Sequence, residues 1–238
     1  MNPSTKDWRL RWTVPSTRLR APRAAAIAGI VFSVLLITSL LLLRRSVPVQ
    51  PSEAGEWLRR TSGTVSIAVN LVPFAGIAFL WFMGVLRDRL GDLEDRFFTT
   101  VFVGSGLLFL TMLFGAAAFV GGIVAAYGVE FDRLPGSATF TVARAVAYET
   151  MNFYAVRMAA VFTIATCTLA LRTGFLSRWI AFIGYGTALA LLFAGRYINW
   201  IVLVFPLWVL LLSLHILVDN FDVSSEVSAS DLDRKSDT

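Results

Sequence analysis

The chain has 238 residues and a formal net charge of +5; 56% of its residues are hydrophobic and only 16% are charged. Soluble domains are typically about 45–50% apolar and about 25% charged, so this composition excludes an ordinary soluble domain and indicates a membrane protein. The single cysteine, Cys167, excludes an intrachain disulfide, and the single histidine, His215, leaves neither a metal-ligand cluster nor a pair of haem ligands. We therefore expect no cofactor and no metal, and we attribute the basic charge to the cytoplasmic side of a membrane protein rather than to nucleic-acid binding.

The predicted elements begin with a basic arm, residues 1–23, which we expect to lie in the cytoplasm. The first apolar run, residues 24–43, would form a helix of about 30 Å, which matches the hydrocarbon core of a bilayer. A secretory signal peptide is the competing interpretation, but Arg44 and Arg45 follow the run where a cleavage site of small residues belongs. We therefore predict a retained membrane span.

The second predicted span, residues 63–86, contains a proline, Pro73, which removes a backbone hydrogen bond and tends to kink a helix. The third predicted span, residues 97–127, is longer than the hydrocarbon core and should tilt or protrude. Small residues recur at every fourth position of this third span, which predicts a flat stripe for close contact with another helix. The stripe consists of Ala118, Gly122 and Ala126.

Residues 128–149 are the most polar internal stretch, and from residue 139 onward the apolar spacing predicts a helix that lies at the membrane interface. This helix is expected to lead into a fourth span, residues 150–171. A second small-residue stripe, Gly186, Ala190 and Ala194, lies in the fifth predicted span. The fifth and sixth spans cover residues 179–195 and 198–218, and the acidic tail, residues 219–238, is expected to be disordered.

Together these runs predict an all-α integral membrane protein, a bundle of about six transmembrane helices with short loops. Lys and Arg are more frequent in the segments that face the cytoplasm if the N-terminus is inside. This asymmetry places both termini in the cytoplasm of a bacterial plasma membrane. The four arginines of the first outer loop are the observation against this orientation.

Arg157 is the most distinctive candidate site residue because it lies within the fourth predicted span, roughly 10 Å along the helix. One interpretation is a binding site for an anionic group, such as a lipid phosphate or a substrate carboxylate. The other is an arginine that snorkels to the headgroups or has a structural partner. Glu149 is a candidate acidic partner on the same side, although about 12 Å of helix separates it from Arg157.

Three further residues complete the predicted ligand-binding set. Asn70, beside the proline of the second span, could open backbone carbonyls to a substrate or ion, or could hydrogen-bond a neighbouring helix. Asn152 and Tyr154 could line a pocket with Arg157, although tyrosine is common at membrane interfaces. No catalytic residue is predicted, because the serine of Gly104-Ser105-Gly106 has no base in reach.

Two segments carry a resemblance to known proteins: NLVPFAGIAFLWFMGVLRDRLGDLEDRFFTTVFVGSGLLF, residues 70–109, and WIVLVFPLWVLLLSLHIL, residues 200–217. Both look like a family of uncharacterised multi-pass membrane proteins from actinobacteria. The resemblance implies a bacterial membrane protein, and it assigns no mechanism and no site residues.

Three classes of function remain open. The sequence favours a non-enzymatic membrane component or accessory subunit, because of the small-residue stripes, the short loops and the near absence of charge within the spans. A transporter or channel for a small or lipidic, anionic molecule is the alternative, and an intramembrane enzyme is the third class. The expected partners are membrane lipids and another membrane protein or a second copy of the chain.

Overall fold

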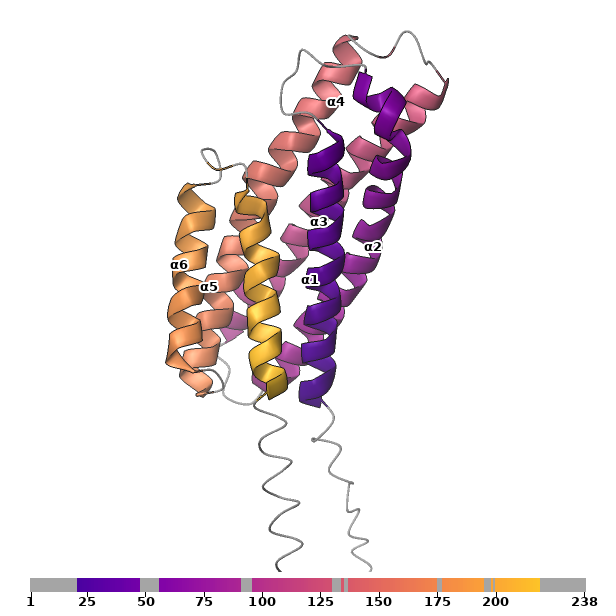
Figure 1. Cartoon of the computed structure of the whole chain (residues 1–238). Helices are drawn as coiled ribbons and strands as arrows, with labels where there is room; N and C mark the ends of the chain where they lie inside the picture. The colour runs from indigo at the N-terminus through magenta and orange to yellow at the C-terminus, as the bar shows by residue number, and fades with distance from the viewer. Residues whose placement is uncertain are drawn as a thin grey trace, which may run out of the picture.

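The computed structural model describes residues 21–47, 56–90, 96–129, 134, 137–174, 177–194, 198 and 200–218. Within these residues every regular element is helical, so the predicted all-α membrane bundle is confirmed (Figure 1). The predicted arm up to residue 20 and the predicted tail lie outside this part of the chain. The elements are α1 (Ala21–Ser46), α2 (Glu56–Leu90), α3 (Arg96–Val129), α4 (Ala138–Glu149), the π-helix η3 (Thr150–Ala155), α5 (Val156–Thr173), α6 (Arg178–Phe193), the 3₁₀ turn η4 (Ile201–Leu203) and a last helix over residues 204–218.

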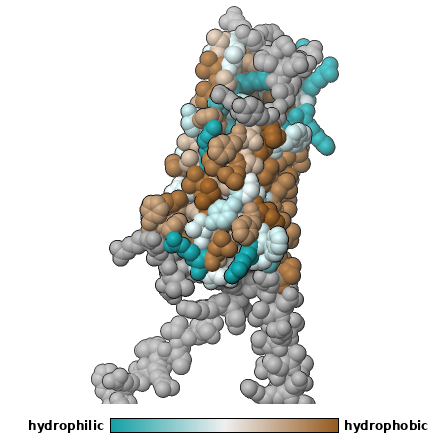
Figure 2. Space-filling view, turned by 90° about the vertical axis from the view of Figure 1, so that its left-hand side faces the viewer, coloured by the Kyte–Doolittle hydropathy of each residue, from teal (hydrophilic) through white to brown (hydrophobic). Residues whose placement is uncertain are grey.

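Five helical stretches of the described chain are long and apolar enough to cross a membrane, and α6, with 16 residues, is a shorter apolar helix. The long stretches are Ala24–Ser46, Trp57–Arg87, Phe97–Val129, Ala138–Thr173 and Ile201–Val218. In Figure 2, hydrophobic side chains cover most of the middle of one face, and hydrophilic residues gather toward its two ends. This distribution is the one that a bilayer around the middle of the bundle requires.

The sequence predicts a helix from residue 139 that lies at the membrane interface and leads into the fourth span. In the structure α4, η3 and α5 form one continuous helical run of 36 residues, Ala138–Thr173. No glycine or proline interrupts this run, so nothing in it ends the helix. The run begins where Ser137 Oγ accepts the Phe140 N–H at 3.2 Å, and it ends at Gly174, whose φ of 67° is left-handed.

The helices alternate in direction between two ends of the bundle (Figure 1). We call the end where α1 begins the basal end and the end where α4 begins the distal end. Two bonds between α1 and α2 show the antiparallel pairing: Ser39 Oγ donates to Ala68 O at 2.8 Å, and Thr61 Oγ1 donates to Ser46 O at 3.0 Å.

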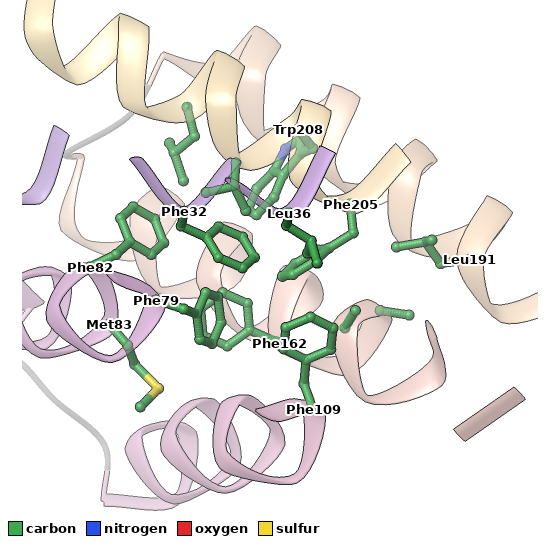
Figure 3. Close-up of a cluster of buried hydrophobic side chains, with 14 of the residues drawn as sticks. Phe32, Leu36, Phe79, Phe82, Met83, Phe109, Phe162, Leu191, Phe205 and Trp208 are labelled. Atoms are coloured by element: carbon green, nitrogen blue, oxygen red, sulfur yellow. The ribbon is translucent and has the colours of Figure 1, made fainter. Parts of the chain in front are cut away.

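Phenylalanine rings from five helices form the centre of the core (Figure 3). Phe32 of α1 packs on Phe79 of α2 at 4.8 Å between ring centroids, and Phe79 packs on Phe162 of α5 at 5.1 Å. Phe109 of α3 meets Phe205 of the last helix at 4.9 Å. Tilted and edge-on ring pairs add about 0.5–1.5 kcal/mol each to the burial of apolar area, so this cluster ties the five helices together.

A second, separate apolar cluster lies nearer the distal end, and its members come from α2, α3, α4 and the chain before α4. They are Trp57, Leu58, Val65, Ile123, Tyr127, Leu134 and Phe140. We call this part of the molecule the distal extension, and we define it as residues 57–69, 118–129 and α4. It rises beyond α6 and the last helix in Figure 1, because α3 is about 50 Å long whereas α6 is about 24 Å long.

Candidate functional site

Arg157 stands in the first turn of α5, directly after η3, and its side chain is half-buried. Its Nη1 donates to Phe153 O at 3.1 Å, and its guanidinium carbon lies 3.5 Å from the centroid of the Phe153 ring. Among the residues that the structure describes, no acidic side chain forms a salt bridge with Arg157. Since a guanidinium has five N–H donors, this arrangement orients the group and leaves donors for a ligand.

The π-helix η3 explains this geometry, and nothing in the hydropathy of the sequence indicates it. The wider turn of the π-helix leaves some backbone carbonyls without a helical partner, and side chains can reach them. Near each end of η3, a side-chain N–H donates to such a carbonyl. Asn152 Nδ2 donates to Tyr148 O at 3.0 Å, and Arg157 donates to Phe153 O. Single π-helical turns within α-helices often occur at functional sites, so η3 marks this region as a candidate site on structural grounds.

Four of the five predicted ligand-binding residues gather around η3. Glu149 is exposed and precedes it, Asn152 lies within it, and Arg157 follows it. Tyr154 is 54% exposed, and its ring packs edge-on against Phe153 at 5.1 Å. The fifth predicted residue, Asn70, is exposed on α2, and within the described chain no hydrogen bond joins it to this group.

Arg157 lies at the same level as a second arginine–aromatic pair that the sequence analysis did not identify. Arg44 of α1 places its guanidinium carbon 4.6 Å from the centroid of the Trp200 ring, and Trp200 is 56% exposed. The ring centroids of Phe162 and Phe205 are 6.1 Å apart. Arg157 precedes Phe162 by five residues, and Trp200 precedes Phe205 by five residues. Both helices run toward the basal end, so Arg157 and Trp200 lie at the same level. Trp and Arg at one level are typical of a membrane interface, which makes this level a candidate for the distal boundary of the apolar zone.

A separate groove of about 300 Å³ lies between α3 and α4 in the distal extension. Its α3 wall contains the predicted small-residue stripe, Ala118, Gly122 and Ala126, and all three residues are exposed rather than packed within the bundle. The remaining lining residues are apolar apart from one threonine: Phe119, Ile123, Leu134, Thr139, Phe140 and Ala143. Helix α3 is the least buried of the five long helices, with 28% of its apolar stretch buried against 61% for Ala138–Thr173.

The remaining nucleophilic and metal-binding side chains form no site in the described part of the chain. Ser105 is buried and donates to Val101 O of its own helix at 2.6 Å, so its hydroxyl is used in helix packing. Cys167 is buried in the core beside Trp208 and Gly184. No group of three or more His, Cys, Asp or Glu side chains among the described residues could hold a metal ion.

Comparison of the chain with protein-family models, with curated protein sequences and with solved structures gave no match. The resemblance to the actinobacterial membrane family therefore stays a prediction. The function is argued below from the chain's own residues.

Proposed function

We propose that this chain is a non-enzymatic component of a membrane protein assembly, in a bacterial plasma membrane with its basal end toward the cytoplasm. In this proposal, a helix of the partner membrane protein packs on the distal part of α3, over Ala118, Gly122 and Ala126. The observation that carries the proposal is that this stripe is exposed and forms the wall of an apolar groove.

The position of the stripe relative to the bilayer supports a protein partner. The hydrocarbon core is about 30 Å thick, whereas α3 is about 50 Å long, so both ends of α3 cannot lie in lipid unless it tilts by more than 50°. In this proposal the level of Trp200 and Arg157 is the distal boundary of the bilayer, and residues 118–129 of α3 lie beyond it. These residues are apolar, yet Phe119 is 44% exposed and Val129 is 86% exposed. Because lipid tails do not reach them there, burial of this surface against another protein is favourable.

The residue types on this surface favour a helix as the covering element. Small residues at every fourth position let two helix backbones approach closely, which gains van der Waals contact that larger side chains prevent. The rest of the distal extension is mixed: α2 exposes Arg59 and Arg60 there, and α4 exposes Thr141 beside the apolar Val142. The α3 face differs from it by its small residues at every fourth position, as expected for close packing of a partner helix.

The transporter alternative has less support. It requires Asn70 and Arg157 to line one polar cavity between the second and fourth crossings. Asn70 and Pro73 are both exposed on α2, and the groove described above is apolar and lies between α3 and α4.

The proposal is tested with two matched glycine substitutions, Gly122→Leu and Gly84→Leu. Both glycines are exposed within long helices, and a Cβ atom at either position meets nothing within 4 Å, so neither change should disturb the fold. Gly122→Leu fills the groove, whereas Gly84→Leu alters α2 near the basal end. The tagged chain is purified from its native membrane in mild detergent, and co-purifying proteins are quantified by mass spectrometry. We expect one stoichiometric partner with the unmodified chain and with Gly84→Leu, and at least about tenfold less with Gly122→Leu.

A cross-linking experiment locates the contact directly. Cysteine introduced as Ala126→Cys should cross-link to the partner, whereas Gly84→Cys should not; the native Cys167 is buried and should remain unreactive. A chain that purifies without a stoichiometric partner, or a partner that Gly122→Leu retains in full, would contradict the proposal.

A further inference from the structure

A narrow accessible stripe runs along α5 below Arg157. Between residues 156 and 170 most side chains of α5 are buried, and five remain half-buried: Met158 and, on another face, Arg157, Val161, Ile164 and Thr168. Their spacing of four, three and four residues places them on one line along the helix. The stripe therefore has a cationic group at its distal end and aliphatic side chains along the next three turns.

The basal end of the stripe is closed by a polar contact with α6. Thr168 Oγ1 and Tyr185 Oη are 2.8 Å apart, and Thr168 also donates to Ile164 O. The hydroxyl of Thr168 is therefore already used, and the open part of the stripe is the aliphatic section at Val161 and Ile164. A ligand for this surface needs an apolar chain for this section and an anionic group for Arg157.

Arg157 is oriented before any ligand binds. Its stacking on Phe153 and its bond to the Phe153 carbonyl restrict the side chain, so less rotamer entropy is lost when a ligand fixes it. Its level coincides with that of Trp200, at the distal boundary of the apolar zone, which is the depth of lipid phosphates. A lipid phosphate offers oxygens in the geometry that a guanidinium fork matches.

We propose that Arg157 and the stripe below it bind one anionic phospholipid, with the phosphate on the guanidinium and an acyl chain along Val161 and Ile164. The face is on α5, away from the distal α3 stripe, so this inference does not depend on the protein partner proposed above. An anionic lipid is favoured over a zwitterionic one because its headgroup brings no ammonium to compete with the arginine.

The test uses the full chain in nanodiscs of phosphatidylcholine that contain a minor fraction of phosphatidylglycerol. After gentle release into detergent, native mass spectrometry counts the phosphatidylglycerol molecules that each variant retains. Arg157→Leu should weaken retention by at least about tenfold, since hydrogen bonds to charged groups contribute about 1.5–3 kcal/mol. The retention of phosphatidylglycerol by Arg157→Lys should lie between that of the unmodified chain and that of Arg157→Leu, because lysine keeps the charge but lacks the paired N–H donors of a guanidinium.

The matched control is Arg172→Leu at the basal end of α5. Arg172 also stacks on an aromatic ring, with its guanidinium carbon 4.3 Å from the centroid of Phe98. Its replacement by leucine removes one positive charge, as Arg157→Leu does. Arg172 follows Thr168 by four residues and so lies at the basal end of the same line, where the contact between Thr168 and Tyr185 separates it from the aliphatic section. We expect this variant to retain phosphatidylglycerol within about twofold of the unmodified chain, because its guanidinium is exposed and does not adjoin the open part of the stripe. Equal losses from Arg157→Leu and Arg172→Leu would reduce the effect to net charge and overturn the proposal.

Two further arms keep the test decisive. Val161→Trp leaves Arg157 in place and obstructs the stripe, so it should lower retention several-fold even if Arg157→Leu fails to fold. Inorganic phosphate at millimolar concentration should not displace the lipid; displacement would mean that the group binds free phosphate and that the acyl chain contributes nothing. Unchanged lipid retention in Arg157→Leu, with loss of a co-purified protein instead, would assign Arg157 to a protein carboxylate and refute the lipid site.

Discussion

Replacing Gly184 of α6 with alanine is predicted to destabilise the bundle, because the added Cβ has no room. A Cβ at this position would overlap the Cys167 sulfur and would stand 2.9 Å from Trp208 Nε1. Both neighbours are buried, so the Cys167 sulfur could leave only by rotating about χ1 into space that other side chains already fill. Overpacking of this kind costs about 1–3 kcal/mol, and the gain in helix propensity from glycine to alanine returns only about 0.5–1 kcal/mol. The expected net loss is about 1 kcal/mol.

The control is Gly186→Ala, the same substitution two residues along the same helix. Gly186 is exposed, and a Cβ there meets nothing within 4 Å, so the variant should gain about 0.5–1 kcal/mol from helix propensity alone. Thermal unfolding in detergent, followed by far-UV circular dichroism, measures both. For a chain of this size about 1 kcal/mol corresponds to about 2–4 °C, so Gly184→Ala should melt about 2–4 °C lower and Gly186→Ala should not melt lower.

A double substitution separates the steric cause from a general weakening of α6. Adding Cys167→Ala to Gly184→Ala removes the sulfur that the new Cβ would overlap. The two changes together should therefore cost less than the sum of their separate costs, by about 0.5–3 kcal/mol, as is usual for residues in contact. Equal melting temperatures for Gly184→Ala and Gly186→Ala, or strict additivity in the double variant, would refute the packing argument.

Two smaller effects follow from single side chains. Ser39→Ala removes the bond to Ala68 O between α1 and α2 and should cost about 1 kcal/mol in the same unfolding assay, with an unchanged melting temperature counting against that bond. Asn70→Leu should change the melting temperature by less than about 2 °C and leave partner and lipid retention intact, because the side chain is exposed; loss of either ligand would restore a polar site on α2.

The helical crossings were predictable because hydropathy and helix length are local properties of the sequence. Runs without charges must cross the bilayer as helices, since unpaired backbone groups are too costly in lipid. The extra length of the third predicted span likewise indicated protrusion, and the structure gives α3 as a helix of 34 residues. The apolar spacing from residue 139 predicted a helix leading into the fourth span, but hydropathy could not show that the two form one uninterrupted run from Ala138 to Thr173.

The π-helix could not be predicted, because it depends on a shift of backbone hydrogen bonds by one residue and not on composition. The sequence pointed to Arg157, Asn152 and Tyr154 individually, through charge and polarity at the edge of a span. It did not indicate that Phe153 would hold the guanidinium in place, since that contact arises from the geometry of η3. The aromatic partner of Arg44 was missed for a similar reason: Trp200 is distant in sequence and close only in the fold.

The sequence identified the small-residue stripes as periodic patterns, but it did not show which way each stripe faces in the bundle. In α6 the predicted stripe begins at Gly186, whereas the glycine that permits close packing is Gly184, in contact with Cys167 and Trp208. In the distal part of α3, Ile123 faces the interior, whereas the stripe residues Ala118, Gly122 and Ala126 face outward. Periodicity identifies a face of a helix, whereas only the positions of the neighbouring helices decide whether that face is covered.

The two proposals are linked by the level of the bilayer boundary. If Arg157 binds a lipid phosphate, then the headgroups lie at the level of Trp200, and the α3 face at Gly122 and Ala126 is above the hydrocarbon. An exposed apolar strip at that height cannot be explained as a lipid-facing surface, so it requires a protein to cover it. If instead lipid chains reached Gly122, Arg157 would be deep in the hydrocarbon, where an arginine without an acidic partner is costly. The measured depth of Arg157 therefore bears on both sites, and a depth near the phosphates favours both together.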